Sequence, residues 1–389
     1  MGADTKIAWC DDTVNLWVGC NKVGPGCLNC YAEARAKRFY PTLELWGPGT
    51  PRLWCHGWRG SLRKLHRRAL REGRRRVVFI NSQSDFFEEN RSLMYQQTVK
   101  SDDVPEGVEK LTEYVRARYG MQREVPLLYG GFSDPGGTKL VSRVCRVGEM
   151  LIDPFRGAGS FLGDYRFASL DDLRVEAFEE FDQHDQLIFM LLTKRPENIE
   201  KMLPVPANGR DPSDPEYRRR DNLLLGTSVA CEDDLANVYS LANCRPYASK
   251  LFVSIEPLVE RVDLSGVLGI EPDRDGSWRR KSKWCADPLV DWVIVGGESG
   301  PGARPCHVEW IEYICQQCEA AGVPVFVKQL GEQSMRRVYG GPAVLDGGVG
   351  VDRVSHVFRN KFVDRKGGDP AEWPERLQRW RQTPWSEAS

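Results

Sequence analysis

Several common sequence patterns are missing from this chain, and each absence excludes a class of protein. No apolar run approaches 18 residues, so we expect no membrane-spanning helix. No phosphate-binding loop of the GxxxxGK[ST] kind is present, which excludes P-loop nucleotide hydrolysis. The 5 histidines are scattered, without the spacing of zinc hydrolases. The net charge is only −1, so the whole chain has no general attraction for polyanions.

The cysteine content indicates a cellular compartment. The chain has 12 cysteines at irregular spacing, and its first residues lack the apolar segment of a secretory signal. This combination favours a reducing compartment over a disulfide framework, so we expect a cytoplasmic protein.

Three cysteines in one short loop carry the strongest chemical pattern. Cys20, Cys27 and Cys30 have six and two residues between them, and glycines and a proline separate the first two. A Cys-x-x-Cys pair can bind one metal ion or one edge of an iron–sulfur cluster, and three thiolates leave one metal position open. The spacing alone also allows a zinc site with a distant fourth ligand, or three unligated thiols.

The loop and its flanks resemble the cluster loop of the radical S-adenosylmethionine (SAM) superfamily, in particular the branch that contains spore photoproduct lyase. They resemble still more closely an uncharacterised family of phage and prophage proteins that carry this three-cysteine motif. Most radical SAM enzymes place three residues, not six, between the first two cysteines. The resemblance runs from about residue 7 to about residue 331, and its further blocks are Asn81–Asp85, Leu192–Pro196, Ser254–Pro257 and Gly296–Pro305.

The resemblance implies a function. A [4Fe–4S] cluster on Cys20, Cys27 and Cys30 would bind SAM at its open iron, and an external electron donor would reduce it. SAM cleavage would then yield a 5′-deoxyadenosyl radical. The phage context and the likeness to a DNA-repair lyase imply a nucleic-acid base, in DNA or a nucleotide, as the substrate. The alternative is a non-catalytic nucleic-acid-binding protein with a structural zinc or iron–sulfur site.

The periodicity predicts an α/β fold with a parallel sheet. Short aliphatic runs alternate with helical patterns, as in strands that are covered on both faces. We expect a partial or near-complete (β/α) barrel of the radical SAM type over residues 1–335, with an insertion at about 95–180 and a C-terminal extension over 336–389 that packs on the barrel. Its strands are expected near Lys6–Trp9, Val77–Ile80, Leu187–Leu192, Leu223–Gly226, Leu251–Val253, Trp292–Val295 and Val325–Val327.

Polar residues follow most of these runs, where a β/α barrel builds its site. Gly296, Gly297 and Glu298 resemble a triplet that holds the SAM amino group in radical SAM enzymes. We assign no catalytic residue, and a simple hydrogen-bond network at the barrel mouth is the alternative for each position. The candidates for cofactor binding are Asn81, Ser82, Ser84, Asp85, Lys194, Thr227, Ser228, Ser254, Glu256, Gly296, Gly297 and Glu298.

A basic segment from Arg59 to Arg76 predicts an amphipathic helix with an arginine-rich outer face. Guanidinium groups bind phosphate in bidentate fashion, so this face is a candidate for nucleic-acid contact. A merely solvated face is the alternative. A second basic cluster lies between Trp278 and Trp284. The predicted nucleic-acid contacts are Arg63, Arg67, Arg68, Arg71, Arg74 and Arg75.

Two further motifs have simpler explanations. Cys315 and Cys318 lie one turn apart in a predicted helix, which is typical of small buried side chains rather than of a second cluster. The segment 153–160 is similar to a cofactor loop of amino-methyltransferases, but it lacks their catalytic motif, which favours a chance Gly-rich turn.

Overall fold

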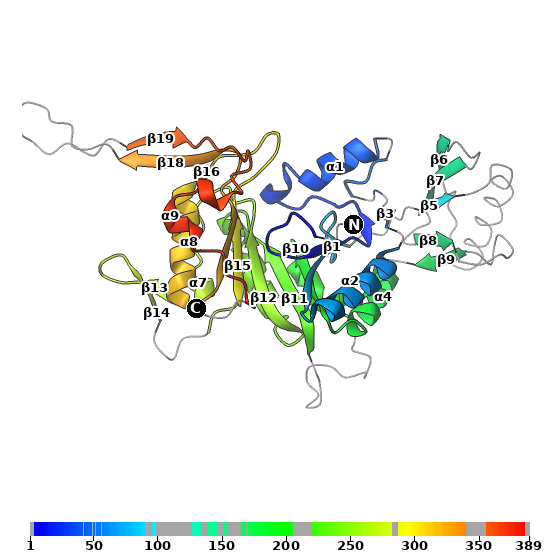
Figure 1. Cartoon of the computed structure of the whole chain (residues 1–389), viewed down its shortest axis with the longest axis horizontal. Helices are drawn as coiled ribbons and strands as arrows, with labels where there is room; N and C mark the ends of the chain where they lie inside the picture. The colour runs from blue at the N-terminus through cyan, green and yellow to red at the C-terminus, as the bar shows by residue number, and fades with distance from the viewer. Residues whose placement is uncertain are drawn as a thin grey trace, which may run out of the picture.

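A seven-stranded parallel sheet forms the centre of the structure (Figure 1). The computed structural model describes residues 4–41, 43–48, 50, 52–55, 57–89, 95–98, 127–133, 139–145, 151–154, 165–168, 170–204, 219–281, 287–339 and 355–385. The strands in spatial order are β1 (Asp12–Val14), β4 (Arg76–Ile80), β10 (Leu187–Thr193), β11 (Arg220–Ser228), β12 (Ala248–Ile255), β15 (Trp292–Gly296) and β17 (Val325–Gln329).

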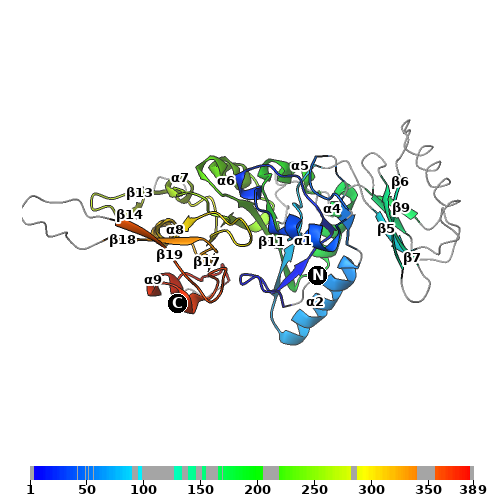
Figure 2. The same ribbon diagram turned by 90° about the horizontal axis from the view of Figure 1, so that it is seen from above.

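The sheet curls into a half-barrel, which confirms the partial-barrel form of the predicted α/β fold (Figures 1 and 2). Six of the seven predicted strands are confirmed, because each aliphatic run is covered on both faces. The strand predicted at Lys6–Trp9 is wrong, since residues 8–9 form a turn and the first strand is β1. An apolar residue stands at position 9 because the Trp9 ring packs on the sheet, where it lies 4.9 Å from the Phe79 ring.

Helices and short strands surround the sheet. The helices are α1 (Tyr31–Phe39), α2 (Trp58–Glu72), α4 (Leu170–Asp182), α5 (Ile199–Met202), α6 (Ala236–Ala242), α7 (Ser265–Leu268), α8 (Val308–Ala321) and α9 (Glu375–Gln378), with 3-10 turns η1 (Pro25–Cys27), η2 (Pro196–Asn198), η3 (Glu232–Leu235) and η4 (Pro370–Glu372). The short strand groups are β2 (Trp17–Val18) with β3 (Leu53–Trp54), β13 (Ile270–Pro272) with β14 (Trp278–Arg280), and β16 (Cys306–His307) with β18 (Ser334–Tyr339) and β19 (Ser355–Arg359). None of these described helices is long and apolar enough to cross a membrane.

The two faces of the sheet bury different sets of side chains. On β4, Val78 and Ile80 join the large core beneath the helices. Val77 and Phe79 point to the other, concave face, where a second cluster includes Phe252 and Trp292. Successive strand residues alternate between faces, so each strand must be apolar throughout. Gly226 has no room for a side chain on this face, because an added Cβ would lie 2.4 Å from the Phe252 ring.

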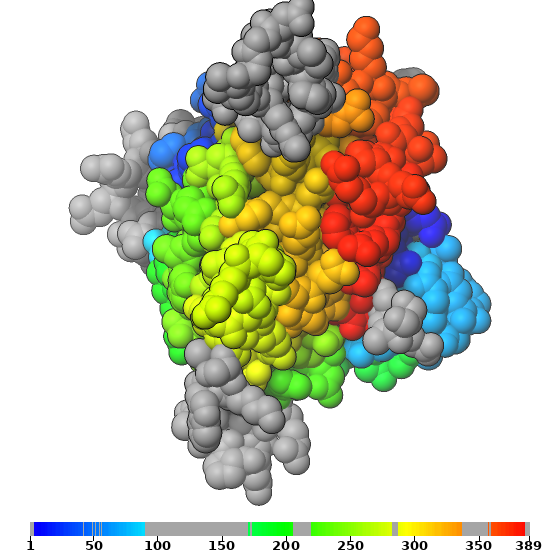
Figure 3. Space-filling view, turned by 90° about the vertical axis from the view of Figure 1, so that its left-hand side faces the viewer, coloured from blue at the N-terminus to red at the C-terminus, as the bar shows by residue number. Residues whose placement is uncertain are grey.

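The C-terminal segment covers part of the concave face. The Trp292 indole donates a hydrogen bond to the Gln382 carbonyl at 2.9 Å, and the Trp385 ring lies 5.4 Å from that of Trp292. Figure 3 shows this segment in red against the amber region that contains α8. Arg376 pairs there with Glu312 of that helix. The C-terminal segment therefore packs on the half-barrel and adds Trp373, Leu377 and Trp380 to the core.

Five strands lie within residues 95–168, at one end of the molecule (Figure 1). They are β5 (Tyr95–Thr98), β6 (Leu127–Ser133), β7 (Lys139–Cys145), β8 (Leu151–Pro154) and β9 (Tyr165–Ala168), and they form two small antiparallel sheets. The amino-methyltransferase-like segment begins at the end of β8, and its residues 155–160 lie outside the described residues. Helix α4, at the end of the expected insertion, packs in the main core through Phe178 and Phe181.

The second Cys-x-x-Cys pair lies on α8, as predicted. Cys315 and Cys318 are fully buried in the large hydrophobic core. Burial raises the pKa of both thiols well above the usual range. These cysteines therefore act as small core side chains.

Two histidines meet between α2 and the end of α4. The rings of His66 and His184 are 4.9 Å apart, and His184 is only 7% exposed. Glu180 and Arg63 are the charged groups beside them. Burial lowers the pKa of His184 below the usual 6.5, so the folded protein disfavours its protonation.

We predict that acid destabilises the protein through His184. The unfolded state takes up the proton as pH falls below 6.5, whereas the folded state resists it, so the free energy of unfolding falls from there until pH passes the lowered folded-state pKa. Denaturant unfolding at several pH values between about 7.5 and 5 measures this loss of unfolding free energy. His184→Phe should reduce it and the matched control His307→Phe should not. Equal pH dependence in both variants would contradict the assignment.

Candidate functional site

The cysteine loop, residues 19–30, lies on the carboxyl edge of the sheet. Gly26 approaches this edge so closely that an added Cβ would be 3.0 Å from Ala230 Cβ and 3.5 Å from Lys194 Cε. Gly19 has a φ of +116°, and an added Cβ there would lie 2.5 Å from the Leu45 carbonyl. Gly19 is thus required by its backbone and close contact, and Gly26 leaves little room for a side chain, as expected for a loop that folds tightly.

The three thiols of the loop have different surroundings. Cys20 lies among buried charges, and burial together with Glu88 and Asp85 raises the pKa of its thiol. Cys27 ends η1, and Cys30 is the N-cap of α1. All three are free and partly exposed. Over the described ranges, no three His, Cys, Asp or Glu side chains are arranged as a metal site.

One buried ion pair holds the first half of the loop. Asp85 follows β4 and accepts a hydrogen bond from the Thr193 hydroxyl at 2.6 Å and from the Lys194 backbone at 3.0 Å. It pairs with Arg195, whose Nη1 lies 2.8 Å from its carboxylate. The other guanidinium nitrogen of Arg195 donates to the Asn21 carbonyl in the loop. The carboxylate orients the arginine, and the arginine orients the loop.

A second pair holds the other half. Arg304 binds the Glu298 carboxylate through Nε at 2.9 Å and Nη2 at 2.8 Å, and its Nη1 donates to the Pro25 carbonyl at 2.9 Å. Asn29 donates to the same carboxylate at 3.1 Å. Burial opposes ionisation of Glu298, but Arg304 and Asn29 outweigh it and hold the pKa of this carboxyl below its usual range. We call Glu298, Arg304 and Asn29 the loop clamp.

A third pair supports the loop from behind. Arg52 and Glu88 are both fully buried and joined by two hydrogen bonds of 2.7 and 2.9 Å. Arg52 also donates to the Leu45 carbonyl at 3.1 Å, and the Trp17 indole donates to Glu88. The segment next to Gly19 is thereby fixed against the sheet.

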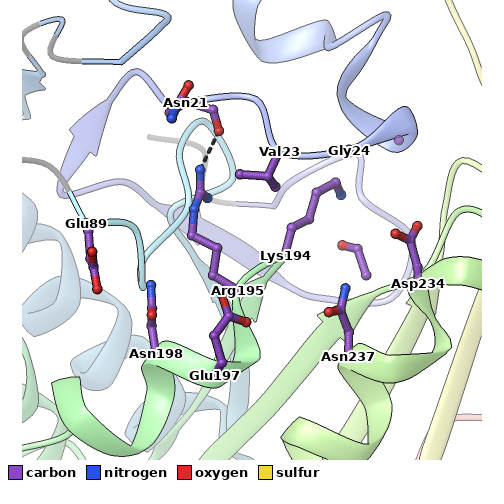
Figure 4. A pocket seen from close by; sticks show the side chains of 12 residues that line it. Asn21, Val23, Gly24, Glu89, Lys194, Arg195, Glu197, Asn198, Asp234 and Asn237 are labelled. Carbon is purple, nitrogen blue, oxygen red and sulfur yellow. Dashed lines mark hydrogen bonds between the residues drawn. The ribbon is translucent and has the colours of Figure 1, made fainter.

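A polar pocket of about 570 Å³ opens between the loop and the ends of β10 and β11. Val23 and Gly24 form its loop side, and Lys194 and Arg195 extend into it from the end of β10 (Figure 4). Within the described part of the chain, the Lys194 ammonium forms no ion pair. Hydroxyl, amide and carboxylate groups complete the lining, from Ser228, Asn198, Asn237, Glu89, Glu197 and Asp234.

The predicted cofactor-binding residues are divided between this pocket and the scaffold. Lys194 and Ser228 line the pocket. Thr227 is fully buried and donates to the Thr193 carbonyl at 3.0 Å, and Ser254 is 2% exposed. Glu256 pairs with Lys328 at 2.6 Å.

The predicted residues that follow β4 mostly support the segments on either side of the cysteine loop. Asn81 has a left-handed backbone with φ of +57°, and its side-chain oxygen accepts from the Leu16 amide at 2.7 Å. Ser84 donates to the Trp17 carbonyl at 3.0 Å. The Ser82 carbonyl accepts a hydrogen bond from the Tyr31 hydroxyl.

The Gly-Gly-Glu triplet has a packing explanation in this structure. An added Cβ on Gly297 would lie 2.4 Å from the Leu330 carbonyl, and one on Gly296 would lie 3.2 Å from the Gln329 carbonyl. The glycines allow the neighbouring strand to approach, and Glu298 belongs to the loop clamp. No role was predicted for Asn29, Arg52, Glu88 or Arg304, because only the fold brings them to partners such as Glu298 for Asn29 and Glu88 for Arg52.

The predicted basic helix is confirmed as α2, which ends at Glu72. Acids from distant segments neutralise much of its positive charge: Arg63 pairs with Glu180, Arg68 with Asp4, and Arg74 with Asp11. Arg76, at the start of β4, is buried against Asp12. In the described chain, the exposed cations without an ion pair in this segment are Lys64, Arg67, Arg71 and Arg75.

Two arginines of the second basic cluster are also paired. Trp278–Arg280 forms a strand of a hairpin, in which Arg279 binds Glu271 at 2.6 Å and Arg280 lies 3.6 Å from Asp287. Lys283 and Trp284 lie outside the described residues.

We predict that the loop clamp restrains the cysteines. Glu298→Gln removes the charge that orients Arg304 and Asn29, which is worth roughly 1.5–3 kcal/mol for a hydrogen bond to a charged group. Cys27 and Cys30 should then react with iodoacetamide about tenfold faster or more, as measured by peptide mass spectrometry on reduced, metal-free protein.

Glu332→Gln is the matched control for this variant. The Glu332 carboxylate accepts a hydrogen bond from the Gly300 amide at 3.0 Å, in the turn that carries the clamp, and it pairs with Arg365. Among the described residues this carboxylate makes no hydrogen bond to the cysteine loop. Both variants should keep the circular dichroism spectrum of the parent. Labelling of Glu298→Gln at the parent rate would show that the clamp does not restrain the loop.

Comparison with known proteins identifies a family but no activity. No curated protein and no solved structure matches the chain. The profile of one family, described as a protein of unknown function (DUF5131), matches residues 4–102 and 163–367. The match covers most of the chain, including the cysteine loop, all seven strands of the half-barrel and the loop clamp, and it confirms the expected likeness to an uncharacterised family. The chain belongs to the DUF5131 family of proteins of unknown function.

Proposed function

We propose that this protein is an iron–sulfur enzyme of the radical SAM type. The observation that carries the proposal is the position of three free thiols on one loop, held by arginines on the carboxyl edge of a parallel half-barrel. That edge is where β/α barrels build their active sites. A polar pocket beside the loop gives room for a small polar ligand.

The donor set fits a cluster with one open position. Cys20, Cys27 and Cys30 would hold it, since thiolates are the ligands of iron–sulfur clusters and none of the three is in a disulfide. When bound, a [4Fe–4S] cluster supplies the electron that cleaves SAM into methionine and a 5′-deoxyadenosyl radical. Ligation would require the thiolate form of Cys20, which burial, Glu88 and Asp85 oppose and the neighbouring Arg195 favours.

The residues of the chain contribute binding and orientation. The Lys194 ammonium suits a carboxylate or phosphate group of a ligand in the pocket, and Ser228 and Asn237 offer hydrogen bonds to it. Arg195 and Arg304 keep the backbone of the loop fixed while a ligand binds. Such rigid support is what a reactive site needs to limit side reactions.

We predict that the protein purified without oxygen is brown and holds about four irons per chain. With dithionite and SAM it should release 5′-deoxyadenosine. Cys27→Ala should lose most of the iron and this activity, because it removes one of three ligands. Cys315→Ala is the matched control, since it also removes the first cysteine of a Cys-x-x-Cys pair, but from the core.

Two outcomes would contradict the proposal. One is a colourless protein with stoichiometric zinc, which favours a structural metal site instead. The other is full iron content in Cys27→Ala.

We also propose a nucleic acid as the substrate. The exposed, unpaired cations of the α2 segment support this part, since they are free to neutralise phosphates. The ion-paired arginines nearby are less suited, because a carboxylate already occupies each of them.

We predict that Arg67, Arg71 and Arg75 bind duplex DNA. Replacing all three with glutamine should weaken the affinity and flatten the log–log salt dependence by up to about 0.9 per lost phosphate contact. The matched control replaces Arg63, Arg68 and Arg74, which removes the same charge but only ion-paired groups. Fluorescence anisotropy over a salt series measures both. Equal losses in the two triple variants would show that only net charge matters.

A further inference from the structure

Helix α1, directly after the cysteine loop, presents unusual side chains to solvent. Tyr31 is 58% exposed and Phe39 is 56% exposed, and Leu28 before the helix is 62% exposed. The adjacent side of the helix buries Ala32 and Ala36. This short helix buries only alanines and leaves the rings of Tyr31 and Phe39 exposed, although the Tyr31 hydroxyl donates a hydrogen bond to the Ser82 carbonyl.

Two arginines lie beside the exposed ring of Phe39. The Arg35 guanidinium carbon is 5.3 Å from the centre of the Phe39 ring, and that of Arg38 is 5.8 Å away. Neither arginine forms an ion pair among the described residues. The one acid of this helix, Glu33, is already bound by Lys22 at 2.6 Å and Lys37 at 2.7 Å. The two guanidiniums therefore keep their charge for an external anion.

These side chains form one stripe. Tyr31, Arg35 and Phe39 are four residues apart in succession, and Arg38 is seven residues after Tyr31, so all four share a face of the helix. From Tyr31 to Phe39 the helix rises roughly 12 Å. That length matches about three stacked nucleotides at 3.4 Å each.

We propose that this stripe, Tyr31, Arg35, Arg38 and Phe39, binds single-stranded nucleic acid. Aromatic rings stack on exposed bases and guanidiniums bind phosphates, and a strand offers both groups in alternation. A folded protein partner fits less well, because a stable protein interface covers about 800 Å² on each side and this stripe contributes only four side chains.

The location of the stripe deepens the proposed function and rests on it. Tyr31 directly follows Cys30, and its hydroxyl donates to the Ser82 carbonyl at the end of β4. A strand bound along α1 would therefore lead to the edge of the half-barrel that carries the cysteine loop. In this proposal α1 presents a single-stranded base to the cysteine loop, whereas α2 contacts the phosphate backbone of a duplex.

Binding of a labelled oligothymidylate of about 20 nucleotides to the full-length, metal-free protein tests the stripe. Replacing Arg35 and Arg38 with glutamine should weaken binding about tenfold and reduce the salt slope by up to about 1.4, at 0.7 per phosphate on single strands. Phe39→Ala should weaken binding about 5- to 150-fold with an unchanged salt slope, because it removes stacking rather than charge.

The matched control replaces Lys22 and Lys37 with glutamine, which removes two charges from the same helix and the loop before it, but only ones paired with Glu33. It should leave the affinity within about twofold and the salt slope unchanged. Parent-like binding by the arginine and Phe39 variants would overturn the proposal and leave the stripe to a protein partner. So would the absence of binding by the parent at about 50 mM salt. Iron content and SAM cleavage are measured separately, so a colourless protein that binds the oligonucleotide would end the proposed enzyme function but not the stripe.

Discussion

The structure depends on how the backbone carbonyl groups of the cysteine loop find hydrogen-bond donors. Apart from η1, the loop has little regular structure of its own, so its carbonyl groups need donors from elsewhere. Arg195, just after β10, and Arg304, just before β16, supply these donors to Asn21 and Pro25. Each arginine is in turn fixed by a buried carboxylate, Asp85 or Glu298. The half-barrel thus orients the loop through charged side chains rather than through strand pairing.

Such pairs fix a geometry more than they stabilise the fold. Removing two charges from water costs several kcal/mol per ion, and their attraction repays this only when every remaining donor finds an acceptor. Arg52 meets this condition, because its guanidinium binds both Glu88 oxygens and the Leu45 carbonyl. Loss of one partner would leave the other charge buried, so these pairs resist change. The desolvation cost of these buried pairs is consistent with a site that needs a rigid loop.

The strands and the main helices could be predicted from the sequence, whereas the supports of the loop could not. Continuous runs such as that of β10 are covered on both faces, so composition alone identifies them. Arg195 and Asp85 are 110 residues apart, and Arg52 and Glu88 are 36 apart, so only the fold brings them together. The basic α2 segment looked free for the same reason, since Asp4, Asp11 and Glu180 reach it from distant parts of the chain. Trp9 looked like a strand residue because covering a sheet and forming one both require apolar side chains.

The apolar cluster on the concave face of the sheet affects how the chain folds during its synthesis. Its packing joins Trp9, near the start, with Phe79 and Trp292, and the Trp292 indole donates its hydrogen bond to the Gln382 carbonyl. A ribosome releases the start of the chain long before residue 382, so this cluster stays incomplete until that residue has been synthesised. Until then, one apolar face of the sheet is open to solvent, and contacts of such sequence separation form slowly. The nascent chain therefore passes through a period in which chaperones have an exposed surface to bind.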